Sequence, residues 1–293
     1  MINKLVIFGV GLIGGSCALA LALREAGAVK EIIGLGRSRE NLEAARTLGI
    51  IDRIETDLAS AVKDADVVVL AVPVAAMQPT LAQLSTCLSP HTIVTDVGST
   101  KRDVIACARQ HLPNYLDHFI PGHPIAGAEK SGATAAFADL FQGRNVVVTP
   151  LPENDAQTVS RIANMWQTCG AIVNTMPAAK HDEIFAAVSH LPHLLAFALV
   201  EDIAFRANAS ELFSYAAGGF RDFTRIAGSH PEMWRDICLA NRDALIREVD
   251  TYQSQLDRLR GMLEQNDGKS LEEVFGHART ARAEWLAGKQ DSQ

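Results

Sequence analysis

The sequence predicts an α/β protein: an N-terminal doubly wound parallel sheet over residues 1–175, followed by an all-α domain over residues 176–293. Short apolar strands alternate with helical segments up to about residue 174, as in a sheet with helices on both faces. From about residue 178 the strand signals stop and helical periodicity continues to the C-terminus. A chain of 293 residues is long enough for two such domains.

The composition is typical of a globular protein that acts on small molecules. Apolar residues make up 48% and charged residues 21%, and a net charge of −7 disfavours non-specific binding to nucleic acid or to an anionic membrane. The five cysteines are scattered and form no Cys-x-x-Cys, which favours free thiols in a reducing compartment. No uninterrupted apolar stretch reaches the roughly 18 residues that a membrane-spanning helix needs. We therefore expect a cytoplasmic protein.

The first strand, over residues 4–8, runs directly into a glycine-rich turn and a helix that ends near Ala26. Strand, turn and helix in this order are the context that the G-x-G-x-x-G pattern requires, because its glycines let the backbone approach a pyrophosphate at the helix N-terminus. The sequence therefore predicts a Rossmann-type dinucleotide-binding domain. The candidate cofactor contacts are Gly9, Gly11, Leu12, Ile13 and Gly14 in the turn, and Val72 after a later strand.

The end of the second strand, over residues 31–35, bears on the choice of cofactor. An NAD site usually carries Asp or Glu here, which accepts hydrogen bonds from the adenosine ribose. This chain has Gly36, followed by Arg37, Ser38 and Arg39. A guanidinium without a carboxylate suits a 2′-phosphate, since charge-assisted contacts contribute about 1.5–3 kcal/mol each. We expect NADP to be favoured over NAD; the alternative is a solvated basic turn.

Further strands are predicted at 66–71, 92–95, 118–120, 145–149 and 171–174, with helices near 75–88, 100–111 and 155–168. Ligands of such sheets lie beyond the carboxyl ends of the strands. Two polar segments fall at those ends, at residues 96–101 and 122–127. His123 is the best candidate for a general base, because an imidazole accepts a proton near neutral pH. We expect His123 in a shaped loop, where it would take the proton of a substrate hydroxyl. Ser99 could share a hydrogen bond with that hydroxyl.

The helical half supplies a second polar cluster. Ser189 and His193 are four residues apart and share a helix face, His190 lies beside them, and Pro192 is expected to bend or interrupt the helix. A zinc site with His181 lacks the His-Glu-x-x-His pattern and a cysteine cluster, so no metal is predicted. Residues 221–225 follow a Gly218-Gly219 turn, where a guanidinium could hold a substrate carboxylate or lie in an ordinary surface loop.

The segment over residues 231–266 is predicted to be nearly continuous helix. Its apolar residues step by four and three, as in a coiled coil, at Leu245, Val249, Tyr252, Leu256, Leu259 and Leu263. A helix about 50 Å long cannot bury this stripe against itself. We expect it to pack across a subunit boundary in a homodimer; the alternative is an intrachain helical hairpin.

The polar motifs together resemble the prephenate/arogenate (cyclohexadienyl) dehydrogenases of tyrosine biosynthesis, from Lys4 to about Asp236. The motifs that carry the resemblance are Gly9-x-Gly11-Leu12-Ile13-Gly14-Gly15-Ser16, Asp96-x-Gly98-Ser99-x-Lys101, Gly122-His123-Pro124-Ile125-Ala126-Gly127-x-Glu129-Lys130-Ser131-Gly132, Ser189-His190-Leu191-Pro192-His193 and Phe220-Arg221-Asp222-x-Thr224-Arg225. Many members of that family carry an Asp near position 36 and use NAD, so this chain departs from the family at its predicted cofactor site.

The resemblance implies an oxidative decarboxylation. Hydride would leave the hydroxyl-bearing ring carbon for the nicotinamide, a base would take the hydroxyl proton, and the ring would lose CO₂ and become aromatic. His123 would be the base or hydrogen-bond acceptor, Ser99 its partner, and Arg225 the carboxylate ligand. The remaining residues implied are His193, Ser189 and His190 near the substrate side chain, Asp222 orienting Arg225, Trp234 in the pocket wall, and Glu129 as a polar residue behind those that contact the substrate.

Two other functions remain open from the sequence. A β-hydroxyacid dehydrogenase shares the domain order but uses a catalytic lysine, for which Lys101, Lys130 and Lys180 are the candidates. A non-catalytic NADP-sensing protein would bind cofactor without turnover. No residue in the sequence separates prephenate from arogenate.

Overall fold

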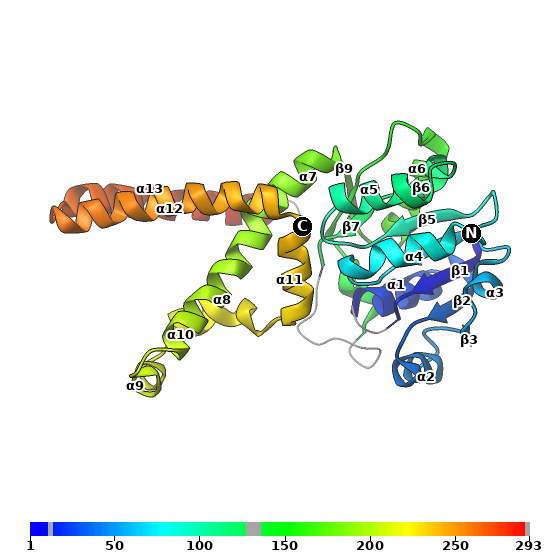
Figure 1. Ribbon diagram of the computed structural model, residues 1–293, viewed down its shortest axis with the longest axis horizontal. Helices are drawn as coiled ribbons and strands as arrows, with labels where there is room; N and C mark the ends of the chain where they lie inside the picture. The colour runs from blue at the N-terminus through cyan, green and yellow to red at the C-terminus, as the bar shows by residue number, and fades with distance from the viewer. Residues whose placement is uncertain (11–13, 127–135, 291–293) are drawn as a thin grey trace. The chain divides into compact units, whose positions relative to one another are not determined.

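A computed structural model describes residues 1–10, 14–126 and 136–290 of the chain (Figure 1). The chain forms two compact units, Met1–Arg242 and Asp243–Gln293. The first unit contains both the sheets and the first helices of the α-helical half. The second unit contains the two longest helices.

The first unit is built on a six-stranded sheet in which every paired strand is parallel to its neighbour, in the order β3-β2-β1-β4-β5-β6. This order is that of a dinucleotide-binding doubly wound sheet and confirms the predicted fold class. The strands are β1 (Ile2–Phe8), β2 (Val29–Leu35), β3 (Arg53–Ile54), β4 (Val67–Leu70), β5 (Ile93–Asp96) and β6 (Phe119–Ile120). Five of them lie where the sequence predicts strands, and the two-residue β3 was not predicted.

Helices cover both faces of this sheet because successive strand residues point to opposite sides. Leu5 and Ile7 pack on one face and Val6 on the other. One face is covered by α1 (Gly14–Glu25), α2 (Arg39–Thr47) and α6 (Ala156–Thr168), and the other by α3 (Leu58–Val62), α4 (Met77–Leu84) and α5 (Arg102–His111).

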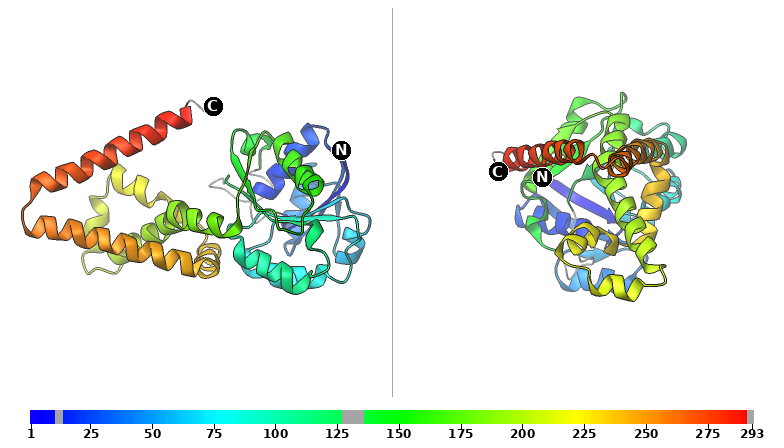
Figure 2. Two further views of the ribbon diagram at one scale, coloured as in Figure 1. Left: turned by 90° about the horizontal axis from the view of Figure 1, so that it is seen from above. Right: turned by 90° about the vertical axis from the view of Figure 1, so that its left-hand side faces the viewer.

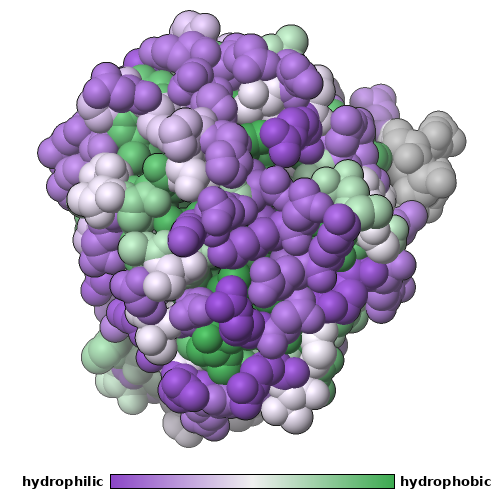
Figure 3. Space-filling model, turned by 90° about the vertical axis from the view of Figure 1, so that its right-hand side faces the viewer, coloured by the Kyte–Doolittle hydropathy of each residue, from purple (hydrophilic) through white to green (hydrophobic). Residues whose placement is uncertain are grey.

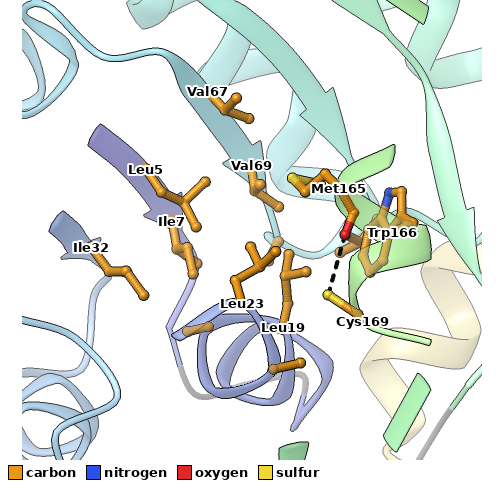
Figure 4. Packing of buried hydrophobic residues seen from close by; sticks show 14 of the residues in the cluster. Leu5, Ile7, Leu19, Leu23, Ile32, Val67, Val69, Met165, Trp166 and Cys169 are labelled. Atoms are coloured by element: carbon orange, nitrogen blue, oxygen red, sulfur yellow. Dashed lines mark hydrogen bonds between the residues drawn. The ribbon is translucent and has the colours of Figure 1, made fainter. Parts of the chain in front are cut away.

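Figure 4 shows the core on the α1 side of the sheet. Leu19 and Leu23 of α1 face Ile7 and Val69, while Trp166 of α6 closes the cluster. These side chains are fully buried, and each fully buried large aliphatic side chain contributes about 1.5–3 kcal/mol to stability. This packing holds α1 against β1 and β4 of the sheet.

A second, three-stranded sheet corrects two of our expectations. It consists of β7 (Gly122–Pro124), β8 (Asn145–Val148) and β9 (Ile172–Thr175), with β7 antiparallel and β9 parallel to β8. The strands predicted at 145–149 and 171–174 exist, but they do not continue the large sheet. His123 lies in a strand opposite Val147, not in a loop. Glycine and proline disfavour strands locally, so β7 forms through its pairing with β8.

The helical part of the first unit begins at Ala178, as the sequence predicts. In the described part of the sheet region that precedes it lie the short 3₁₀ segments η1 (Val74–Ala76), η2 (Leu116–His118) and η4 (Ala138–Phe141). The helical part comprises α7 (Ala178–Phe185), the π-helical turn η5 (Ala186–His190), α8 (Leu191–Ala204), α9 (Ala209–Ser214), α10 (Gly218–Thr224), the 3₁₀ turn η6 (Arg225–Gly228) and α11 (Pro231–Ala240). Gly218 and Gly219 begin a helix here, so the turn predicted for them is wrong.

The run Ala178–Ala204 is one continuous helical segment, long and apolar enough by composition to cross a membrane. Pro192 lies in the first turn of α8, directly after the π-helical turn. Proline is tolerated in a first turn, where its missing N–H would have no intrahelical partner. His181 and His190 in this segment are fully buried with polar partners. The segment therefore serves in this fold as a wall of a polar site.

The helix predicted over 231–266 is interrupted. α11 ends at Ala240, and α12 (Arg242–Glu264) begins two residues later. The side chain of Asn241, between them, donates to the backbone oxygen of Asp182 at 2.7 Å, so this residue is held by a tertiary contact that the sequence pattern does not reveal.

The second unit is a pair of helices, α12 and α13 (Gly268–Gln290), each of 23 residues and so about 35 Å long. Asn266, with φ of 53°, lies in the connection. Figure 2 shows the two helices diverging from that connection. A helical hairpin therefore exists, but Tyr252, Leu256 and Leu263 remain exposed on it. Leu245 of the same stripe is buried and Val249 and Leu259 are partly buried, so the chain by itself buries the stripe only in part.

Figure 3 views the first unit from the side of the sheets. Hydrophilic side chains cover most of this face, and hydrophobic ones form small separate groups. Single exposed apolar residues are normal on a protein surface. The more notable apolar exposure lies in the helical half, at Phe205, Tyr215 and Phe223.

Candidate active site

Gly9, directly after β1, has a conformation and a close contact that require glycine. Gly9 has φ of +110°, and a Cβ at this position would lie 2.3 Å from the backbone oxygen of Ala71 at the end of β4. Only glycine therefore lets the turn lie this close to the neighbouring strand. Val72 lies next to this contact and is buried, and α1 begins at Gly14. Gly11, Leu12 and Ile13 lie outside the described residues.

The end of β2 presents the residues predicted to select the cofactor. Arg37 is exposed, whereas the guanidinium of Arg39 binds the carboxylate of Glu43 at 2.7 Å. The Ser38 hydroxyl accepts from the Asn41 backbone N–H at 3.3 Å and caps α2. A Cβ at Gly36 would meet no heavy atom closer than 3.6 Å, so a larger residue fits there.

A buried ion pair joins the two polar segments at the carboxyl ends of the strands. Lys101 Nζ contacts the Asp96 carboxylate and donates to the backbone oxygen of Gly122 at 2.6 Å. Asp96 in turn accepts from the backbone N–H of Gly122 at 3.1 Å and of Gly98 at 2.8 Å. Lys101 and Asp96 have no exposed surface. The pair therefore holds the turn that carries Ser99 and the strand that carries His123 at one place.

Ser99 and His123 are accessible within this buried surrounding. Ser99 is the one side chain between Asp96 and Lys101 that is not buried, and His123 is half-buried. His123 lies next to the carboxyl end of β5, where ligands of such sheets bind. The structure therefore brings the two predicted catalytic residues to the cofactor edge of the sheet.

A second histidine, His181 at the start of the helical half, completes the surroundings of His123. His123 Nδ1 lies 2.8 Å from His181 Nε2, and His181 Nδ1 lies 2.8 Å from Asp182 Oδ1. Phe185, one turn further along α7, packs its ring against both imidazoles. The sequence singled out His181 only as a metal candidate and did not single out Asp182.

The Asp182 carboxylate is anchored by backbone donors from the start of α5. Oδ1 accepts from Lys101 N at 2.8 Å and Oδ2 from Arg102 N at 2.9 Å. Burial by itself raises the pKa of Asp182, but the hydrogen bonds from His181, Arg102 and Lys101 lower it below its ordinary value. Asp182 is therefore an ionised acceptor that ties α7 to the sheet domain.

The surroundings of His123 favour its neutral form. Burial, and then the neighbouring charges at His181, Lys101 and His190, lower the pKa of His123 well below 6.5. Burial likewise lowers the pKa of His181, although its bond to Asp182 opposes this. A neutral imidazole at neutral pH is what a general base requires.

His190 lies between the two histidine clusters. It is fully buried, and its Nδ1 is 3.1 Å from Asn241 Nδ2, which also donates to the Asp182 backbone oxygen. Burial lowers the pKa of His190 to about 4. His190 is close enough to influence the charge of both His123 and His193, so it links the predicted base to the predicted substrate pocket.

Three of the residues predicted for the substrate side also lie close to one another. The His193 ring stacks on Trp234 with centroids 3.5 Å apart, and its Nδ1 lies 2.9 Å from the backbone oxygen of Ser189. Burial and the positive charge of Arg225 lower the pKa of His193, while the bond to Ser189 raises it. His193, Trp234 and Arg225 therefore lie together, at the junction of α8, η6 and α11.

The other residues predicted for the site have different surroundings. The Asp222 carboxylate lies 3.7 Å from the Arg221 guanidinium, and both side chains are largely exposed. Glu129 lies outside the described residues. Of the lysines, Lys101 is engaged by Asp96, Lys180 is exposed, and Lys130 is not among the described residues. Within the described ranges, no group of three or more His, Cys, Asp or Glu side chains could hold a metal ion.

A sheet of dinucleotide-binding strand order, with a histidine of lowered pKa at its carboxyl edge and a guanidinium near His193, is the arrangement of a nicotinamide-dependent dehydrogenase. Two family models match the chain: the prephenate dehydrogenase nucleotide-binding domain over residues 19–175 and the prephenate dehydrogenase dimerization domain over residues 177–277. The chain belongs to the prephenate dehydrogenase family.

Individual relatives agree with this assignment over nearly the whole chain. A cyclohexadienyl dehydrogenase of Zymomonas mobilis is 37% identical over 99% of this chain and 97% of its own length. A prephenate dehydrogenase of Bacillus subtilis is 39% identical over 96% of this chain and 76% of its own. The crystal structure of the Aquifex aeolicus prephenate dehydrogenase with hydroxyphenyl propionate and NAD⁺ is 35% identical, with a TM-score of 0.90 over 97% of this chain and 98% of its own.

Proposed function

We propose that this chain oxidises and decarboxylates prephenate, arogenate or both, with His123 as the base. Membership of the family makes it an oxidoreductase that depends on a pyridine nucleotide. The observation that carries the proposal is the placement of His123: a half-buried imidazole with a lowered pKa, beside the carboxyl end of β5, the strand that leads into the turn carrying Ser99.

The chemistry follows from these side chains. His123 accepts the proton of the ring hydroxyl, and Ser99 shares a hydrogen bond with that hydroxyl. A bound nicotinamide would supply the acceptor for the hydride that leaves the hydroxyl-bearing ring carbon. The ring carboxylate then leaves as CO₂, and its bonding electrons complete the aromatic ring. General-base assistance of this kind contributes about 10²–10⁴ in rate.

The substrate's carboxylates need cationic partners, and Arg225 is the residue we assign to one of them. Its charge is felt at His193, whose ring is held by the stacked Trp234 and by the Ser189 backbone. A guanidinium binds a carboxylate through two parallel N–H donors, which fixes orientation as well as charge. We place Ser189, His190 and His193 near the substrate side chain. We assign Asp222 to orienting Arg225, and Glu129 to a polar position behind the residues that contact the substrate.

We propose NADP as the favoured cofactor, with NAD as the alternative. The support is the absence of a carboxylate at position 36 together with the exposed Arg37. The Aquifex aeolicus relative was crystallised with NAD⁺, so the family accommodates the cofactor without a 2′-phosphate. We also propose that the nucleotide-binding domain spans 1–175 and the substrate domain 176–293, and that the protein is a cytoplasmic homodimer joined through its C-terminal helices.

Replacing His123 with Asn tests the proposal. Reduced nucleotide is followed by absorbance with prephenate and with arogenate, each with NAD and with NADP. The variant should lose about 10²–10⁴ in kcat while cofactor affinity is nearly kept. Turnover equal to that of the unsubstituted protein would point to a different base, such as a lysine. Absence of turnover in the unsubstituted protein with all four combinations would favour a non-catalytic nucleotide-binding protein.

A further inference from the structure

The hydrogen bonds around His123 form a chain with a direction. The Asp182 carboxylate can only accept, so the His181 nitrogen 2.8 Å away, Nδ1, must donate. His181 has a lowered pKa and is neutral near pH 7, so its other nitrogen, Nε2, carries no proton. Nε2 therefore accepts, and the donor 2.8 Å from it is His123 Nδ1. In neutral His123 the proton is then on Nδ1, and Nε2 carries the lone pair.

We propose that His181 and Asp182 are positioning residues, which hold His123 in the one tautomer and ring orientation whose Nε2 can accept the substrate's proton. This inference rests on the proposed role of His123. The base and its orienting pair come from different parts of the chain: His123 lies on β7, and the pair lies on α7. A base must be both correctly oriented and in the correct tautomer to act.

Asp182, at the far end of this chain of hydrogen bonds, is held rigidly. Its two carboxylate oxygens accept from the backbone N–H groups of Lys101 and Arg102, where α5 begins, and its backbone oxygen accepts from Asn241. His181 and Asp182 are fully buried, so water does not compete for these bonds. Phe185 packs against both imidazole rings and further limits their rotation. The positioning pair therefore has little freedom to turn.

Three variants test the proposal. His181→Leu removes the acceptor for His123 Nδ1 and should lower kcat by about 10–100-fold, the usual effect of losing a partner that orients a histidine, with little change in KM or cofactor affinity. His181→Gln is the matched control, because its amide can still accept from His123 and donate to Asp182, and it should keep most of the activity. The double variant His123→Asn/His181→Leu should be no slower than His123→Asn alone, because His181 acts through His123.

Nitrogen-15 NMR of histidine-labelled protein supplies a readout that packing alone would not move. His123, assigned by its loss in His123→Asn, should be the Nδ1–H tautomer in the unsubstituted protein and in His181→Gln, and should become a mixture in His181→Leu. An Nε2–H tautomer in the unsubstituted protein overturns the proposal even if the leucine variant fails to fold. Losses that multiply in the double variant also overturn it. Full activity of His123→Asn instead rejects the proposed base, which is a different outcome.

Discussion

At the scale of single residues, position 36 and its neighbour bear on cofactor choice. A Cβ at Gly36 meets nothing closer than 3.6 Å, so Gly36→Asp should be accommodated and should supply the carboxylate that binds an adenosine ribose.

Arg37→Ala should raise KM for NADP by about 10–100-fold, the equivalent of one charge-assisted contact, and change KM for NAD little. Arg39→Ala is the control, since Glu43 already binds that guanidinium. Steady-state kinetics with both cofactors measure this; equal effects on the two would remove the 2′-phosphate assignment.

The lowered pKa of His123 sets the pH dependence of turnover. Burial and the charges at His181, Lys101 and His190 all disfavour its protonated form, so the active, neutral base persists below pH 6.5. We expect kcat/KM to be nearly constant from pH 8 to about 6.5 and to fall only at lower pH, as His123 becomes protonated. A pH–rate profile measures this. An acidic limb centred above pH 7 would contradict the assignment of the base to His123.

His190 makes folding itself sensitive to acid. Its pKa is about 4 in the folded protein against 6.5 ordinarily, so the unfolded chain takes up a proton first as the pH falls. The contribution of His190 to the free energy of unfolding is therefore fully present above pH 6.5. Between pH 7 and 5 the free energy of unfolding should decrease by about 2 kcal/mol from this group alone. Urea unfolding at both pH values measures the change. His190→Gln should lessen this pH dependence, and replacement of the exposed His91 by Gln should not.

The residues that the sequence could identify are those whose chemistry stands out in a polar motif beside a strand end, such as Ser99 and His123. The hydrogen bond between His123 and His181 could not be predicted from the sequence, because it joins β7 to α7 across 58 positions of the chain. The adjacent His181-Asp182 pair at the start of the first helix of the helical half was the available signal. Asn241 carried no signal, since an asparagine in a helical pattern is ordinary.

At the scale of secondary structure, the Asp96–Lys101 ion pair joins β5, the turn after it and β7. Lys101→Met would leave the Asp96 carboxylate buried and unpaired, which typically costs about 3–5 kcal/mol. Asp96→Asn added to Lys101→Met should recover part of that loss, because a neutral amide is less costly to bury and can still accept from the Gly122 N–H. Urea unfolding of the two variants measures which has the larger free energy of unfolding. A double variant less stable than the single one would contradict the prediction.

The same scale shows where local patterns suffice. The strands β1, β2 and β4 lie where the sequence predicts them, because burial on both faces of a parallel sheet leaves a continuous apolar run. The helices α5 and α6 lie where helical segments are predicted, and each buries one face. The three-residue β7 and the break at Asn241 were missed, because each is held by a distant partner: β8 pairs with β7, and Asp182 accepts from Asn241. Tertiary contacts override local preference at both places.

At the scale of the whole molecule, the second unit leaves a large apolar surface uncovered. The exposed apolar side chains of this unit are Ile246, Tyr252, Leu256, Leu263, Phe275, Trp285 and Leu286. The diverging α12 and α13 cannot bury one another's faces along their length (Figure 2). An exposed apolar surface of this kind marks an interface. The family model that matches residues 177–277 describes a dimerization domain, which agrees in kind with this expectation.

The homodimer can be tested on the stripe of α12. Val249 and Leu256 lie on its apolar face, and replacing both with Glu would place two charges per subunit in a desolvated interface, which neither subunit could neutralise. We expect the double variant to elute as a monomer in size-exclusion chromatography with light scattering, at concentrations where the unsubstituted protein is a dimer. Thr251→Glu/Ser254→Glu adds the same charge away from the stripe, on exposed positions, and should remain dimeric. A dimer that survives the substitutions at Val249 and Leu256 would mean that subunits associate through another surface, and the exposed aromatic residues Phe205, Tyr215 and Phe223 would be the next to replace.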